Sequence, residues 1–433
     1  MSRIASNFFR FGSFEIFKGP SEDGDHDGRA GPSAGNEALR QQLLDHILLY
    51  YPDISSSPAR YEEVFKEVVR RTAYLAARWQ CVGFVHGVLN TDNMSLMGLT
   101  IDYGPFGFME HFDPQYVPNG SDTSARYSYQ EQPTICKWNL AKLAEALGSL
   151  LSKASAEGIL GEYDAIYEHY FQALVGAKFG FLATDADTSL DVGHLFSNVR
   201  VNDELPPPRC PSGLLLPEDL ALVSGFFTTL SATGTDFTDA FVALTEYVEA
   251  LGEGAASASV QAAQGAVLVD KLVSRSATPA SVVQSMRRKL KIHRLNMQPG
   301  QIQQLFSILQ TATPAQLRNM FSGAPVEAIR DEVTSEKRKL DMLVAASTAV
   351  KKYEALSGPV KAKADREHWQ QWCDVYTARV AQLCSSPAEC TRRAAIMRAQ
   401  NPTFVLRSWL AQDAIKLAED GADYSGVRTL LQM

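Results

Sequence analysis

The segment Val85–Met109 reads VHGVLNTDNMSLMGLTIDYGPFGFM, and its polar residues decide how the rest of the chain is interpreted. His86 comes first, Asp92 and Asn93 follow as neighbours, and Asp102 lies nine residues beyond Asn93. Mg²⁺ prefers hard oxygen ligands, and proteins often supply only one or two while phosphate and water supply the rest. One carboxylate and one amide oxygen suit that share. Asn93 and Asp102 are therefore candidate magnesium ligands.

The residues between these two ligands predict a short β-hairpin. Met94–Thr100 carries Gly98 at a turn position, with apolar residues on either side. Such a hairpin would bring Asn93 and Asp102 side by side. Any one of these polar residues could simply cap a turn or end a strand, and His86 alone is more typical of a packed histidine. The whole ordered set in its strand–turn context favours a functional site.

The same order resembles the H-G-D-x-x-x-x-N and I-D-F/W-G motifs of small-molecule kinases. In those enzymes the first Asp receives the substrate proton, and the Asn and second Asp hold Mg²⁺ on the nucleotide phosphates. Here Val88 stands at the position of the first Asp, and a different carboxylate, Asp92, directly precedes Asn93. This difference predicts nucleotide chemistry other than ordinary phosphorylation.

A longer run, RWQCVGFVHGVLNTDNMSLMGLTIDYGPFGFMEHFDP at residues 78–114, resembles the signature block of the SelO (selenoprotein O) family. The resemblance covers nearly the whole chain, and the eukaryotic branch of the family fits best. Members are kinase-fold proteins that bind ATP in a flipped orientation and transfer AMP, not phosphate, to protein hydroxyls. Further matching segments are Arg3-Ile-Ala, residues 9–17 (FRFGSFEIF), 28–33 (GRAGPS), 132–133 (QP), 138–140 (WNL) and 234–238 (GTDFT), Trp369 with Trp372, and Asn401-Pro402.

The resemblance assigns roles to five residues. It implies that Asp92 is the catalytic base, that Asn93 and Asp102 are the magnesium ligands, and that Asp102 also contacts the nucleotide. Arg3 and Arg10 match arginines that contact ATP phosphates, a task that suits the guanidinium fork. The implied cofactors are ATP and Mg²⁺, with Mn²⁺ as a second candidate cation. The implied partners are protein substrates with Ser, Thr or Tyr hydroxyls.

The expected fold class is mainly α with a small β-hairpin, as a protein-kinase-like large lobe plus a helical C-terminal extension. We expect residues 1–36 to be a remnant of the lobe connection with a loose Gly/Asp/Pro segment, and residues 37–251 to form the kinase-like lobe. Residues 252–281, rich in Ala, Ser and Gly, are predicted to be a linker or insertion. Residues 282–433 are the predicted helical extension.

Apolar periodicity predicts three helices in the lobe. One begins at Ser57-Pro58 and carries apolar residues from Tyr61 to Trp79 on one face. A second begins at about Trp138, and a third spans Leu39–Tyr50.

Two parts of the SelO pattern have no match in these residues. One is the nucleotide-binding lobe with its glycine-rich loop, since neither G-x-G-x-x-G nor G-x-x-x-x-G-K-[ST] occurs. The other is the tail with a redox-active Cys or selenocysteine. We therefore expect a C-terminal-lobe fragment, an incomplete gene model or a degenerate copy. The alternatives to AMP transfer are a catalytically dead pseudokinase that acts as a scaffold, a kinase-type phosphotransferase, and a helical interaction protein with a coincidental motif.

Composition restricts the classes of partner and the cellular compartment that are expected for this chain. The chain has 433 residues, and a net charge of −8 argues against a nucleic-acid partner. No apolar run approaches the ~20 residues that span a bilayer, so no membrane partner is expected. The six cysteines form no C-x-x-C pair, which favours a reducing compartment. A mitochondrial location is implied by the resemblance to the eukaryotic branch alone. Oligomeric state is not predicted.

Overall fold

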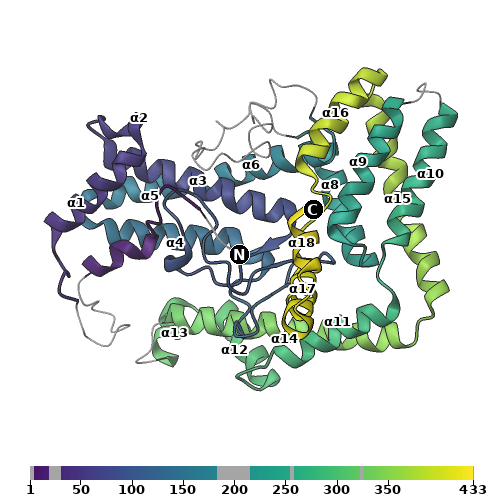
Figure 1. Ribbon diagram of the computed structural model, residues 1–433. Coiled ribbons are helices and arrows are strands. Elements are labelled where there is room, and N and C mark those ends of the chain that lie inside the picture. Colours follow the sequence, from purple (N-terminus) through teal and green to yellow (C-terminus); the bar gives the residue numbers. More distant parts are fainter. Residues whose placement is uncertain (1–3, 19–30, 183–214, 254–257, 322–325, 433) are drawn as a thin grey trace.

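The computed structural model describes residues 4–18, 31–182, 215–253, 258–321 and 326–432. This part of the chain is mainly helical, with one two-stranded antiparallel sheet (Figure 1). None of its helices is long and apolar enough to cross a membrane. The α-helices are α1 Glu37–Ile47, α2 Pro52–Ser55, α3 Arg60–Val82, α4 Gln132–Leu147, α5 Lys153–Gly161, α6 Tyr163–Lys178, α8 Pro217–Thr233, α9 Phe237–Glu253, α10 Ala258–Ser274, α11 Pro279–Ile292, α12 Pro299–Thr311, α13 Pro314–Met320, α14 Val326–Glu354, α15 Gly358–Leu383, α16 Pro387–Gln400, α17 Ser408–Gly421 and α18 Ser425–Gln432.

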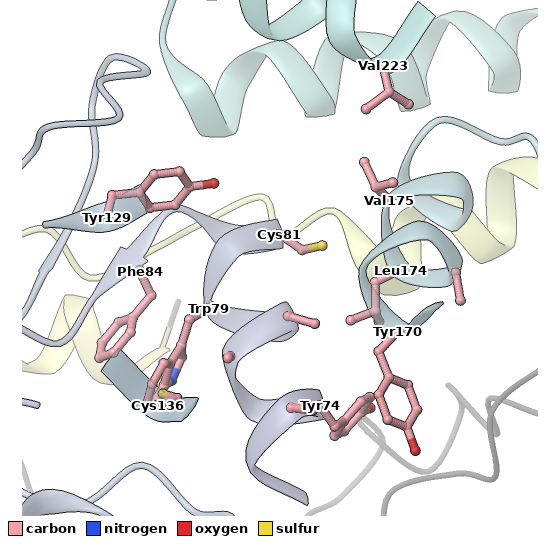
Figure 2. Packing of buried hydrophobic residues seen from close by; sticks show 14 of the residues in the cluster. Tyr74, Trp79, Cys81, Phe84, Tyr129, Cys136, Tyr170, Leu174, Val175 and Val223 are labelled. Atoms are coloured by element: carbon pink, nitrogen blue, oxygen red, sulfur yellow. The ribbon is translucent and has the colours of Figure 1, made fainter. Parts of the chain in front are cut away.

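Helix α3 is the central helix of the half that carries the site, and it leads directly into the site loop. Figure 2 shows Tyr74 and Cys81 of α3 on the side that faces Tyr170 and Leu174 of α6. Gly83, with φ of 68°, ends α3 in the left-handed conformation that glycine adopts without strain. The predicted helix is confirmed, and its buried residues include Val64, Phe65, Val68, Val69 and Trp79.

The start of α3 differs from the prediction by a few residues. The hydroxyl of Ser57 accepts a hydrogen bond from the Ala59 amide at 3.2 Å, so Ser57 organises a turn and the helix begins at Arg60. Helix α4 begins at Gln132, six residues before the predicted Trp138, because Pro133 occupies its first turn. The predicted Leu39–Tyr50 helix appears as α1 followed by a 3₁₀ turn, Leu48–Tyr50.

The strands lie outside the predicted hairpin. β1 (Phe84–Val85) pairs with β2 (Gly107–Phe108), with Phe84 opposite Phe108. Met94 and Thr100 form only a single antiparallel bridge. The turn at Gly98 is as predicted, with φ of 70°, and a Cβ there would lie 2.6 Å from Arg71 Cβ. Packing against α3 therefore keeps this segment tight and leaves room for one bridge rather than a ladder.

Residues 252–281, predicted to be a linker or insertion, contain a packed helix over much of their length. Residues 258–274 form helix α10, which packs against α9 and α15. Leu268, Val269 and Leu272 are buried there. The Ala- and Ser-rich composition suggested mobility, but Ala is the best helix former and these three apolar residues share one helix face. The predicted loose segment at 21–36 lies mostly outside the described residues.

The C-terminal helices share the main core. Trp369, Trp372 and Tyr376 of α15 pack with Phe226 of α8, and the Trp369 and Phe226 ring centroids are 5.6 Å apart. Met397 of α16 belongs to the same cluster as the buried residues of α3. A second small cluster joins α12, α13 and α14 through Leu309, Leu317 and Val333. In Figure 1 helices α11–α14 lie below the loops of the candidate site.

Candidate functional site

The site loop starts at His86, which is fully buried. Its Nε2 lies 2.8 Å from the Ile101 carbonyl, and its Nδ1 lies 3.4 Å from the Val88 amide nitrogen. These contacts suit a neutral ring that donates from Nε2 and accepts at Nδ1. Burial lowers the pKa of His86, and the bond to Ile101 opposes that shift only in part. The interpretation of His86 as a packed histidine is therefore confirmed, and its ring ties the loop to the Ile101 carbonyl, directly before Asp102.

Helix α4 fixes the loop from behind through two fully buried amide side chains. Gln132 Oε1 accepts from the His86 amide at 2.9 Å, and Gln132 Nε2 donates to the Phe84 carbonyl at 2.9 Å. Asn139 Nδ2 donates to the Leu89 carbonyl at 3.0 Å. These bonds satisfy loop backbone groups that β-pairing does not reach. The sequence comparison matched both residues but gave them no role.

Asp92 and Asn93 lie on the short 3₁₀ helix Thr91–Asn93. Asn93 is 6% exposed, and its Nδ2 donates to the Val88 carbonyl at 2.9 Å. The side-chain oxygen of Asn93 is consequently the atom left for a cation. Asp92 is exposed beside it. A Cβ on Gly12 would lie 2.2 Å from Asp92 Oδ1, so the missing side chain at Gly12 makes room for this carboxylate.

Asp102 follows directly on Ile101, the residue held by His86, and is exposed. Its φ of 56° is uncommon for a residue with a side chain, although Asp tolerates it better than most. Backbone conformations of this kind cluster at functional sites. Met94 directly follows Asn93, and Thr100 lies two residues before Asp102, so the Met94–Thr100 bridge lies between the two candidate ligands. The segment thus returns on itself, as predicted, with the two candidate ligands at its ends.

Arg10 is anchored to the same loop. Its Nη1 donates to the Asp92 carbonyl at 3.0 Å, and its backbone forms an antiparallel bridge with Ser95. The next residue, Phe11, begins the 3₁₀ helix Phe11–Phe17 and donates its amide to the Met94 carbonyl at 2.9 Å. One guanidinium bond to the loop uses one of five N–H donors. Arg10 is therefore beside the site, whereas Arg3 lies outside the described residues.

The donor set fits a magnesium ion that is shared with phosphate. Within the described ranges there is no group of three or more His, Cys, Asp or Glu residues that could hold a metal by themselves. An Asn oxygen and an Asp carboxylate are both hard ligands, and Mg²⁺ commonly takes only one or two protein ligands beside phosphates and water. Asn93 and Asp102 could thus hold Mg²⁺ only together with a phosphate-bearing ligand.

Sequence reasoning missed the residues that support the site. Gly12 leaves space for Asp92, and Asn119 donates from Nδ2 to the Gly87 carbonyl at 3.1 Å. One signal for this packing is present in the sequence, namely the glycine in the His86-Gly87 pair. Gly87 has φ of 82°, and a Cβ there would lie 2.7 Å from the Pro105 carbonyl oxygen.

Comparison with known proteins identifies the family. The family model described as protein adenylyltransferase SelO matches residues 1–433. The mitochondrial protein adenylyltransferase SelO of Mus musculus is 36% identical and the mitochondrial SelO-1 of Danio rerio is 37% identical, each over 100% of this chain. The protein nucleotidyltransferase YdiU of Thiobacillus denitrificans is 44% identical over 189 residues, 43% of this chain and 36% of its own. This chain spans 56% of the mouse protein and 55% of the zebrafish protein. The chain belongs to the SelO family of protein adenylyltransferases.

Proposed function

We propose that this chain transfers AMP from ATP to hydroxyl groups of Ser, Thr or Tyr residues in other proteins. The observation that carries the proposal is the site loop, which holds Asp92, Asn93 and Asp102 on two connected turns and has Val88 where a kinase base would lie. Family membership supports the reaction class, because the relatives are a protein adenylyltransferase and a protein nucleotidyltransferase. The activity is a proposal for this chain, which spans about half the length of these relatives.

In the proposed reaction, the substrate hydroxyl oxygen bonds to the α-phosphorus of ATP and pyrophosphate leaves. Asp92 accepts the hydroxyl proton, a role that suits an exposed carboxylate with open space at Gly12. Asn93 and Asp102 would hold Mg²⁺, which supplies neutralisation of charge on the phosphates. Arg10, through the N–H groups not used on Asp92, would pair with phosphate oxygens.

We also propose the large-lobe arrangement of a protein kinase for the part that carries the site. A long helix, α3, leads into a loop with the Asp–Asn pair, and this loop returns through the Met94–Thr100 bridge before Asp102. A mitochondrial location is proposed because the mouse and zebrafish relatives are mitochondrial proteins. Co-fractionation of the protein with a mitochondrial matrix marker would support that location, and its recovery only with cytosolic markers would contradict it.

Label transfer decides between the proposed activity and its alternatives. The purified protein is incubated with Mg²⁺ or Mn²⁺, a mixture of candidate protein substrates, and either α-labelled or γ-labelled ATP. We expect protein-bound label from α-labelled ATP only. Label from γ-labelled ATP only would identify a phosphotransferase. Absence of label from both, in a protein with the helical circular dichroism expected from the fold, would overturn the proposal and favour a non-catalytic scaffold.

A further inference from the structure

The segment that follows Asp102 is held from below by helices α11 and α14. Lys289 of α11 forms an ion pair with Asp113, and Arg338 of α14 forms one with Glu131 at 3.2 Å. Between them, Ser335 Oγ donates to the Ser124 carbonyl at 3.3 Å. We call Lys289, Ser335 and Arg338 the clamp residues. They contact the start, the middle and the end of residues 113–131.

Helices α11 and α14, which carry the clamp residues, are themselves held in place by buried contacts. Helices α11 and α14 pack along each other. Glu336 and Lys339 of α14 form an ion pair at 2.5 Å in which both side chains are 2% exposed. The same Glu336 carboxylate accepts the Asn296 amide at 2.7 Å, which fixes the chain just after α11. Breaking such a buried pair is costly, so this part of the molecule resists local change.

Residues 113–131 are internally bonded as one unit. The Tyr129 amide donates to the Tyr116 carbonyl at 3.0 Å, and the Gln130 amide donates to the Pro114 carbonyl at 3.0 Å. At the turn, the Asp122 carboxylate accepts the Tyr127 amide at 2.8 Å and the Arg126 amide at 3.1 Å. A displacement at Asp113 or Ser124 is therefore carried by the whole unit.

Residues 113–131 also contact the loop that carries Asp92 and Asn93. Asn119 Nδ2 donates to the Gly87 carbonyl at 3.1 Å. A Cβ on Gly87 would lie 3.2 Å from Pro118 Cγ, so backbone and proline are in close contact. Asn93 in turn bonds the Val88 carbonyl, one residue beyond Gly87. The contacts run without a break from α11 and α14 to Asn93.

We propose that Lys289, Ser335 and Arg338 are positioning residues, which fix residues 113–131 and, through Asn119, set the place of Asp92 and Asn93. This inference rests on the proposed function for the roles of Asp92 and Asn93. It gives the C-terminal helices a part in the site although none of the clamp residues belongs to the loop itself. Loss of the clamp is expected to reduce the kcat/KM of AMP transfer, because Asp92 and Asn93 are displaced.

The test is a charge reversal with its rescue, read by amide hydrogen exchange in the full 433-residue protein. Lys289→Glu should raise exchange in residues 113–131 and in residues 86–93, by roughly 5-fold, through local opening. The double variant Lys289→Glu with Asp113→Lys should restore both regions. Lys291→Glu is the control, because it makes the same charge change at an exposed position of α11. Arg338→Glu with Glu131→Arg repeats the test if Lys289→Glu fails to fold.

Two results would overturn the inference. One is faster exchange in residues 113–131 with residues 86–93 unchanged, since the segment would then not hold the loop. The other is no rescue by the reversed pair. Exchange needs no catalytic activity, so the inference can fail or hold independently of the proposed function. Where label transfer is measurable, a lower kcat/KM in Lys289→Glu, and recovery in the double variant, are the expected kinetic results.

Discussion

The site loop and the aromatic core around α15 are held together in different ways. The loop of residues 86–102 depends on side chains that bond its backbone, such as Gln132 and Asn139 on α4, and its candidate site carboxylates are exposed. The core depends on apolar contact, with Trp369 fully buried and its indole satisfied by Thr235 Oγ1 at 2.9 Å. This difference separates the residues that determine stability from those that are expected to determine activity. Substitution in the core should cost stability, whereas substitution of an exposed site residue should cost activity and leave stability nearly unchanged.

The largest expected effect is on the core side of this comparison. Trp369→Ala should lower the free energy of unfolding by about 4 kcal/mol, because it leaves a large cavity and removes the hydrogen bond from the indole to Thr235 Oγ1. Urea denaturation followed by circular dichroism measures the change. Trp409→Ala is the control, since that side chain is 50% exposed and should change stability little. Equal losses in the two variants would contradict the assignment of the core.

The next largest expected effect is a loss of activity at the candidate site. Asp102→Asn should reduce label transfer by about 10²–10³-fold, because it removes a charge that faces the proposed magnesium ion. Asn is chosen because it tolerates the left-handed backbone of Asp102, so stability should shift by less than about 0.5 kcal/mol. Glu157→Gln, an exposed carboxylate on α5, serves as control. Full activity in Asp102→Asn would remove Asp102 from the metal site.

The sequence was sufficient for the parts of both regions that depend on local pattern. The family was recognised from the resemblance of residues 78–114 and further segments to SelO sequences, and the helix before the site loop follows from apolar periodicity. The turn at Gly98 was also predictable, because a glycine between two short apolar runs is a strong turn signal.

The rest depends on contacts between residues distant in the chain. The sequence gives no sign that Gln132 and Asn139 bond the backbone at Phe84–Leu89, nor that Gly12 faces Asp92. The helix at residues 258–274 was not predicted, because low complexity is a property of composition, whereas the helix depends on partners in α9 and α15. The actual strand pair was missed because two-residue strands carry no periodicity.

Lys178 tests whether the core tolerates a charge. Its ammonium lies 3.9 Å above the Phe241 ring, and its Nζ donates to the Gln400 carbonyl at 3.3 Å. Burial lowers the pKa of Lys178 to about 7. The unfolded chain keeps this proton up to about pH 10, so it binds more protons than the folded protein between pH 7 and 10. Stability should therefore rise with pH in that window, by at most about 1.4 kcal/mol per pH unit.

Urea midpoints measured at pH 7, 8 and 9 test this dependence, and the variant Lys178→Met gives the comparison. The variant should lack the rise attributable to Lys178. An equal rise in the parent and in Lys178→Met would assign the dependence to other groups, and the core would then have to stabilise the charged lysine.

Gly12→Ala gives the smallest expected effect, and it tests the boundary between the two regions. An added Cβ would lie 2.2 Å from Asp92 Oδ1, and the flexible carboxylate can turn away while the backbone stays in place. We expect about a 10-fold loss of label transfer, because the proposed base is displaced, with a change in the free energy of unfolding below about 1 kcal/mol. Gly161→Ala is the matched control, because a Cβ there meets nothing within 4 Å. A stability loss as large as that of Trp369→Ala would mean that Gly12 belongs to the core. Unchanged activity would mean that the orientation of Asp92 does not limit the reaction, and the role of catalytic base would then have to pass to another residue.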